Sequence, residues 1–200
     1  MRRDRALKVV LVLVGLLFRA GVIPLTMFFS REPAVPVHSS LQKMKQVYLT
    51  TDGACIRNPG PGGWACVLRT GNRAGEISGC DPHTTNNRME LRAVIEGLRA
   101  LPEQCKVIVR SDSQYVQRGV TKWIKRWKSN GWKTTDGRPV LNQDYWRELD
   151  KLNAFCTPDW QWIKGHADDA DNIRCDLLAK KAARQQIASN GLNWLEEKQK

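Results

Sequence analysis

The chain has 200 residues, 42% of them hydrophobic, which is enough for one folded domain with a sizeable core and some additional chain. Its formal net charge of +12 favours a polyanionic partner such as nucleic acid. The six cysteines form no C-x-x-C pair and have no Cys/His partner at zinc spacing. A zinc site and a disulfide framework are therefore not expected.

Residues 1–43 differ from the rest of the chain. A basic start precedes an apolar run over 9–18, which Arg19 and Pro24 interrupt before it reaches the roughly 20 residues that a membrane-spanning helix needs. A signal peptide also has a basic start and an apolar stretch of about 7–15 residues. Three explanations stay open: translation could begin at Met44, the segment could be a membrane-proximal anchor, or it could be a cleaved signal.

The domain expected from the pattern covers residues 44–188, with 1–43 as an N-terminal extension and linker and 189–200 as a flexible tail. β-branched content predicts its first strand, and glycines and prolines predict the loop that follows. The expected elements, in chain order, are a strand at 46–52, a loop at 58–63, a hairpin of strands at 63–70 and 74–80, a helix at 84–101, a strand at 106–112, helical segments at 114–120 and 122–130, a helix at 141–152, a strand at 160–166 and a helix at 171–186.

This order predicts an α/β (α+β) fold with a mixed β-sheet and helices on its faces, because three meandering strands precede the alternation of strands and helices. The helix at 84–101 has Thr84, Thr85 or Asn86 as candidate N-caps. One face of this helix carries Val94 and Leu98, and Glu90 lies on the same face, one turn before Val94. A carboxylate in an apolar stripe is costly unless something compensates its charge.

Three other acids are candidates to lie near Glu90. Asp52 ends the first strand and Asp112 ends the fourth, so both carboxylates would meet at one edge of the sheet if these strands are parallel neighbours. Asp176 borders the apolar face of the closing helix. A strand-terminal aspartate is also a common turn former or helix cap, and this simpler interpretation applies to each residue taken singly.

Four converging carboxylates would repel one another unless cations lay between them. Ligands that are all oxygen favour Mg²⁺, with Mn²⁺ possible, over zinc. Two such ions about 3.5–4 Å apart can activate a water and stabilise a leaving oxygen in phosphodiester cleavage. The carboxylates therefore point to a two-metal hydrolase.

Five motifs in chain order, TDGACIRNPGPGGWA, TTNNRMEL, SDSQYV, KGH and NIRCDLLA, resemble ribonuclease HI of the bacterial type. The resemblance runs from about residue 44 to 183. It implies an RNase H-like fold with a five-stranded mixed sheet, flanking helices and a basic helical protrusion. It also implies a monomeric, cytoplasmic endonuclease that hydrolyses the RNA strand of RNA/DNA hybrids and leaves 5′-phosphate and 3′-hydroxyl products. A retained N-terminal segment would instead anchor the enzyme at a membrane.

The resemblance assigns roles residue by residue. Asp52, Glu90, Asp112 and Asp176 match the four metal-binding carboxylates, with Asp52 shared between both ions. His166 matches a loop histidine that assists proton transfer or product release. The chain departs from the family pattern in the acidic loop ADDADN after His166 and at Ile173.

Substrate contacts also follow from the resemblance. Asn58, Asn86, Asn87 and Gln114 match positions that read the 2′-hydroxyl in the minor groove, Thr85 matches one that holds a DNA phosphate, and Arg88 would add charge beside it.

The segment 118–138 has seven Lys/Arg, one acid and three tryptophans and resembles the basic protrusion. Trp123, Trp127, Asn142 and Trp146 match positions that line its channel, although the two tryptophans at i and i+4 could instead serve packing alone. Two other functions stay open: a hybrid-binding protein without turnover, and another nuclease of the same superfamily.

Overall fold

The computed structural model describes residues 45–101, 105–165 and 169–189, which belong to one structural unit within Lys43–Lys200. The predicted N-terminal extension, His166, and all of the predicted tail 189–200 except Ser189, which ends α6, lie outside the described residues.

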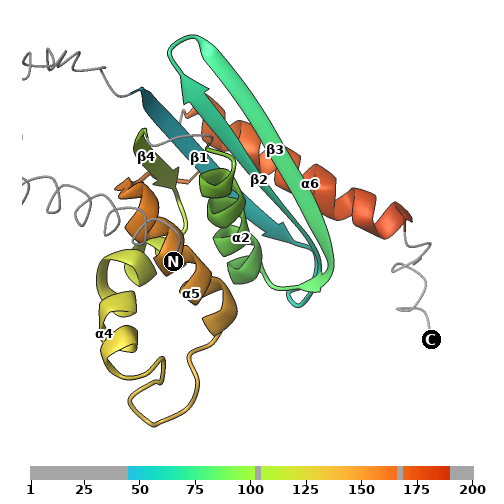
Figure 1. The fold of residues 1–200 in the computed structure, drawn as a ribbon. Coiled ribbons are helices and arrows are strands. Elements are labelled where there is room, and N and C mark those ends of the chain that lie inside the picture. Colours follow the sequence, from blue (N-terminus) through green and yellow to red (C-terminus); the bar gives the residue numbers. More distant parts are fainter. Residues whose placement is uncertain (1–44, 102–104, 166–168, 190–200) are drawn as a thin grey trace, which may run out of the picture. The chain divides into compact units, whose positions relative to one another are not determined.

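A five-stranded mixed sheet forms the centre of this unit (Figure 1). Its strands lie in the order β3-β2-β1-β4-β5. β1 pairs antiparallel with β2 and parallel with β4, and β4 pairs parallel with β5. The predicted mixed sheet is therefore confirmed, including the parallel pairing that the site prediction required. The strands are β1 (Gln46–Cys55), β2 (Gly60–Thr70), β3 (Arg73–Thr84), β4 (Lys106–Ser111) and β5 (Asp159–Trp162).

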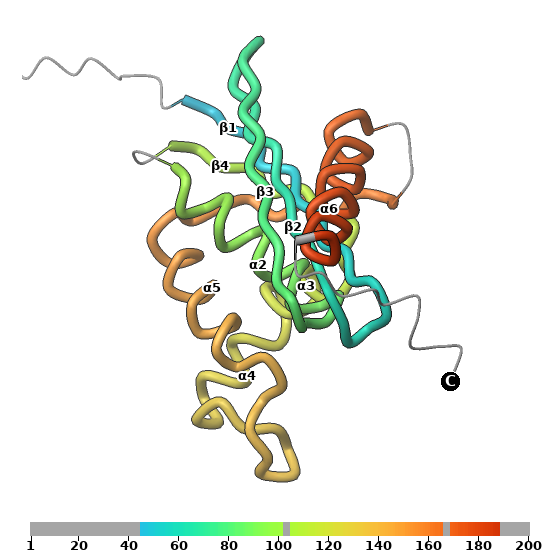
Figure 2. Tube along the Cα trace, turned by 90° about the vertical axis from the view of Figure 1, so that its right-hand side faces the viewer, coloured from blue at the N-terminus to red at the C-terminus, as the bar shows by residue number. Residues whose placement is uncertain are grey.

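Helices cover both faces of the sheet, with α2 and α5 on one face and α6 on the other (Figure 2). Thr85, one of the candidate caps, is the N-cap of α2, because its side chain accepts a hydrogen bond from Arg88 N. The two helical segments predicted after β4 form one nearly continuous helical run. The helices are α2 (Asn86–Arg99), α3 (Gln114–Arg118), η2 (Gly119–Trp123), α4 (Ile124–Ser129), α5 (Gln143–Cys156) and α6 (Ala170–Ser189).

The predicted loop at 58–63 is wrong in its last four residues, because β2 begins at Gly60. Gly63 pairs with β1 and β3 and lies directly under α6. A Cβ atom on Gly63 would lie only 2.2 Å from the carbonyl oxygen of Ala179 and 2.6 Å from the amide nitrogen of Ala183. The glycine therefore permits helix and strand backbones to touch, and it does not mark a turn. The last strand is also shorter than predicted, since β5 ends at Trp162.

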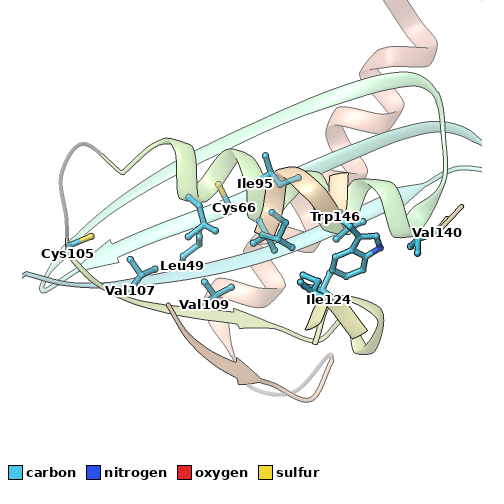
Figure 3. Packing of buried hydrophobic residues seen from close by; sticks show 14 residues of the cluster. Leu49, Cys66, Ile95, Cys105, Val107, Val109, Ile124, Val140 and Trp146 are labelled. Atoms are coloured by element: carbon cyan, nitrogen blue, oxygen red, sulfur yellow. The ribbon is translucent and has the colours of Figure 1, made fainter. Parts of the chain in front are cut away.

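The main core lies between the sheet and the α2–α5 face (Figure 3). Val94 and Leu98, the predicted apolar stripe of α2, are buried there against Leu49 of β1 and other core side chains. Trp146 of α5 is fully buried and packs against Gly119, where a Cβ would lie 1.9 Å from the indole ring. No helix in the described part of the chain is long and apolar enough to span a membrane.

Candidate active site

Three carboxylates meet at one edge of the sheet. Asp52 lies in β1, Asp112 directly follows β4, and Glu90 lies in the second turn of α2. One oxygen from each of the three lies within 4.8 Å of the others. Gly53 makes this approach possible, because a Cβ there would be 2.3 Å from the amide nitrogen of Glu90. The parallel pairing of β1 with β4 and the close contact of α2 with β1 thus create the cluster.

Burial and mutual repulsion disfavour the charged forms of these acids. Asp52 is 8% exposed, and burial followed by the nearby Asp112 raises its pKa to about 7, although the Gly53 N–H donates to its Oδ1 at 2.7 Å. Burial, and then the charges of Asp52 and Asp112, raise the pKa of Glu90 well above its usual value. Glu90 Oε1 accepts a weak hydrogen bond of 3.3 Å from Asn86 Nδ2, whereas the buried Oε2 accepts no hydrogen bond from any residue that the structure describes.

The cluster opens into a cleft of about 580 Å³, and α6 forms one wall of this cleft. Asp176, the fourth predicted carboxylate, lines the cleft but lies outside the three-carboxylate cluster. Its oxygens instead form an ion pair with Lys180 Nζ at 2.8 Å, one helical turn away. The structure therefore brings three predicted carboxylates within 4.8 Å of one another, and the fourth lines the same cleft.

Asn172 is a site residue that the sequence prediction missed. It is 2% exposed, and its Nδ2 donates to Asp112 Oδ2 at 3.4 Å, while its buried Oδ1 has no hydrogen-bond partner in the described part of the chain. Its position, four residues before Asp176, was the available signal, because residues at i and i+4 share a helical face.

The donor set fits a divalent cation. All of the converging ligands are carboxylate or amide oxygens, which Mg²⁺ and Mn²⁺ prefer. The Oε2 atom of Glu90 accepts no hydrogen bond from the described residues, and the pKa of Asp52 is raised. Both observations indicate that the described protein groups do not balance the negative charge of the cluster. His166 cannot be placed, but Gly165 before it lies against Asp112, because a Cβ on Gly165 would be 2.7 Å from Asp112 Oδ2.

The predicted substrate residues of the TTNNR motif surround the N-terminus of α2. Asn58 Oδ1 accepts a hydrogen bond of 3.1 Å from the Asn86 N–H, which ties the β1–β2 loop to the helix. Thr85 caps the helix, and Asn87 is exposed. Arg88 forms an ion pair with Asp144 at 2.8 Å and lies 4.2 Å from the centre of the Tyr145 ring. The positive charge of Arg88 is thus already balanced by Asp144 of α5.

Gln114 is exposed at the start of α3, where its Oε1 accepts a hydrogen bond of 2.9 Å from Arg118. Asn142 begins α5 with a positive φ of 57° and donates to the Tyr115 hydroxyl at 3.1 Å. In the chain, Gln114 precedes the protrusion, residues 118–138, and Asn142 follows it.

The protrusion carries a shallow basic and aromatic pocket of about 270 Å³ that includes Trp123, Arg126, Trp127 and Lys133. The rings of Trp123 and Trp127 are half-buried and lie 5.6 Å apart. The prediction that Trp146 lines the channel is wrong, because its side chain is fully buried. Trp146 instead packs against Trp127, whose ring centre lies 5.4 Å away. Packing and an exposed aromatic face are thus both present in this cluster.

Comparisons with known proteins agree with this geometry. The RNase H family model matches residues 44–184. Ribonuclease H of Solibacter usitatus (strain Ellin6076) is 56% identical over 146 residues, which cover 73% of this chain and all of that protein. Ribonuclease HI of Neisseria meningitidis serogroup B is 53% identical over 139 residues, which cover 70% of this chain and 96% of that protein.

Solved structures show the same fold. The crystal structure of LC9-RNase H1, described as a type 1 RNase H with the type 2 active-site motif, has a TM-score of 0.65 and 30% sequence identity. The match covers 72% of this chain and 74% of that chain. The region matched by the family model includes all four carboxylates. The chain therefore belongs to the RNase H family, the enzymes that hydrolyse the RNA strand of RNA/DNA hybrids.

Proposed function

We propose that the chain cleaves the RNA strand with two Mg²⁺ ions held by Asp52, Glu90, Asp112 and Asp176, leaving a 5′-phosphate and a 3′-hydroxyl. The observation that carries the proposal is the buried Glu90 Oε2, which accepts no hydrogen bond from the described residues although two further carboxylates lie beside it. Such an arrangement is costly without a cation, and it lies in the cleft of about 580 Å³ that α6 helps to line. Mn²⁺ has the same ligand preference and is expected to substitute.

Bound ions would supply an activated water on one side of the scissile phosphate and charge stabilisation for the leaving oxygen on the other. Asp52, which both Asp112 and Asp176 repel, would contact both ions. Asn172 holds Asp112 through its amide and orients that carboxylate. His166 is proposed to move a proton at the reacting phosphate or to assist product release, and the contact of Gly165 with Asp112 supports a position at the site for it.

Hybrid recognition is proposed to use two surfaces. Asn58, Asn86, Asn87 and Gln114 would read the 2′-hydroxyl of the RNA strand in the minor groove. Thr85, at the N-terminus of α2, would help hold a DNA phosphate through free backbone N–H groups, with the ion-paired Arg88 steadying the helix. The protrusion pocket, with Trp123 and Trp127 beside two cationic residues, suits the sugar and phosphate of the DNA strand.

The enzyme is proposed to act as a monomer without a protein partner, because each carboxylate comes from the same chain. Residues 44–188 are proposed to be the catalytic domain, and the enzyme is proposed to be cytoplasmic. Residues 1–43 would add membrane association where that segment is present and retained.

A cleavage assay tests the proposal. Full-length protein and Mg²⁺ are incubated with RNA/DNA, RNA/RNA or DNA/DNA duplexes of one sequence. An RNA strand is end-labelled in the first two duplexes and a DNA strand in the third. Only the hybrid should be cut, and Asp52→Asn should bind it normally but cut it at least about 100-fold more slowly, as expected when a catalytic carboxylate that holds the metal ions is lost. Asp159→Asn, which removes an exposed carboxylate on β5, serves as the matched control and should cut at the wild-type rate.

Two outcomes would overturn parts of this proposal. A wild-type protein that binds the hybrid without cutting it would be a binding protein rather than a nuclease. Equal cleavage of all three duplexes would indicate another nuclease of the superfamily.

A further inference from the structure

The wall of the cleft formed by α6 carries a line of charged side chains at helical spacing. Asp176, Lys180 and Arg184 all line the cleft, and each follows the previous one by four residues. Four residues advance an α-helix by about 6 Å, so the three side chains occupy successive turns of one face. The wall therefore runs from the carboxylate edge to a cationic end about 12 Å along the helix axis from Asp176.

Packing fixes the rotation of α6 that produces this wall. Ala179 and Ala183 are buried against β2, where the missing Cβ of Gly63 lets the two backbones touch. A rotation of the helix would move both alanines out of this contact. Arg184, next to Ala183, is consequently presented to the cleft by a rigid element rather than by a loop.

The two cations of the wall differ in what already binds them. Lys180 is held by Asp176 at 2.8 Å, so its charge is matched inside the protein. Arg184 forms no ion pair with any residue of the described part of the chain, and it is exposed. A guanidinium without a carboxylate partner suits the bidentate binding of a phosphate.

We propose that Arg184 binds a phosphate of the RNA strand, several nucleotides from the bond that is cut. This inference rests on the proposed function, because the strand that meets the carboxylates is then the RNA. That strand then passes along the α6 wall, and Figure 1 shows α4 of the protrusion and α6 on opposite sides of α2. A distance of about 12 Å corresponds to roughly three to four nucleotides at about 3.4 Å of axial rise per nucleotide in one strand.

Binding measurements on slow-cutting protein test the proposal. Arg184→Met and Lys181→Met are each made in the Asp52→Asn background, and the Kd for the hybrid is measured with Mg²⁺ from low to high salt. Lys181 is the matched control, because it is an exposed cation of α6 that does not line the cleft. Arg184→Met should weaken binding about three- to tenfold and reduce the salt slope of log K by about one.

The identity of the strand is tested with single neutral methylphosphonate linkages. A neutral linkage at the contacted RNA phosphate should weaken binding to the parent protein but have little further effect on Arg184→Met, since a shared contact is lost only once. Equal effects of Arg184→Met and Lys181→Met on binding would overturn the proposal. The proposal would also fail if only neutral linkages in the DNA strand, and none in the RNA strand, lost their effect on binding in Arg184→Met. Failure of the parent protein to bind the hybrid, or of the wild type to cut it, would instead overturn the proposed function.

Discussion

Asp52→Asn is expected to stabilise the metal-free protein at neutral and alkaline pH, although the same change removes its activity. The wild-type carboxylate is 8% exposed and faces other acids, and its pKa rises from an ordinary value of 3.8 to about 7, mainly through burial and then through Asp112. An asparagine keeps an oxygen that can accept the Gly53 N–H, but it carries no charge to be repelled.

The sign and size of the effect follow from linkage. Because the folded state binds the Asp52 proton more tightly than the unfolded state, its stabilising contribution is complete below pH 3.8 and is lost as the pH rises to about 7. A shift of about three pKa units at 1.36 kcal/mol each amounts to about 4 kcal/mol. The free energy of unfolding of Asp52→Asn should therefore exceed that of the wild type by about 1 kcal/mol at pH 4.5 and by about 4 kcal/mol at pH 8.

Urea unfolding of the full-length chain in EDTA at the two pH values measures this difference. At pH 8 the corresponding increase in Tm is about 10 °C for a domain of this size. Asp159→Asn changes an exposed aspartate of β5 and controls for a general loss of negative charge. Its difference in unfolding free energy from the wild type should not grow from pH 4.5 to pH 8. Added Mg²⁺ should stabilise the wild type more than Asp52→Asn. A stability gap that does not change with pH, or a variant less stable at pH 8, would refute repulsion at Asp52.

Other variants test the packing around the site. Trp146→Ala should lower the free energy of unfolding by about 3–5 kcal/mol in urea titrations, because the indole is fully buried. Trp127→Ala, at a half-buried ring of the protrusion pocket, should cost less stability and weaken hybrid binding in a titration. Gly63→Ala should displace α6 from β2, because its Cβ would lie 2.2 Å from Ala179 O, and calorimetry should show weaker Mg²⁺ binding.

The sequence was sufficient to predict features that depend on local pattern. Asp52 and Asp112 end strands, and strands that run parallel side by side bring their carboxyl ends together. Glu90 was recognised as unusual because its position in an apolar helical stripe is visible from spacing alone. Thr85 was among the candidate caps because threonine before a helical pattern is a preferred N-cap.

Features that depend on tertiary contact were not predictable in this way. Gly60 and Gly63 resemble loop glycines in the sequence, but Gly60 is required by the close approach of the Ile56 and Arg57 carbonyls and Gly63 by the packing of α6 on β2. The Arg88–Asp144 ion pair joins residues 56 positions apart, so no local pattern indicated that this cation was already matched. Trp146 differs from Trp127 only in its exposure, which the arrangement of α5 against the protrusion decides.

The buried Glu90 connects fold stability to function. Gly53 brings the β1 backbone against the α2 backbone beside this carboxylate, and its buried Oε2 accepts no hydrogen bond from the described residues. A glutamine would add two N–H donors beside Asp52 and Asp112 and would remove the repulsion, so a purely structural requirement favours glutamine at this position. The presence of the acid therefore implies that an external positive charge completes the site, and the metal-free fold is less stable than its core alone would permit.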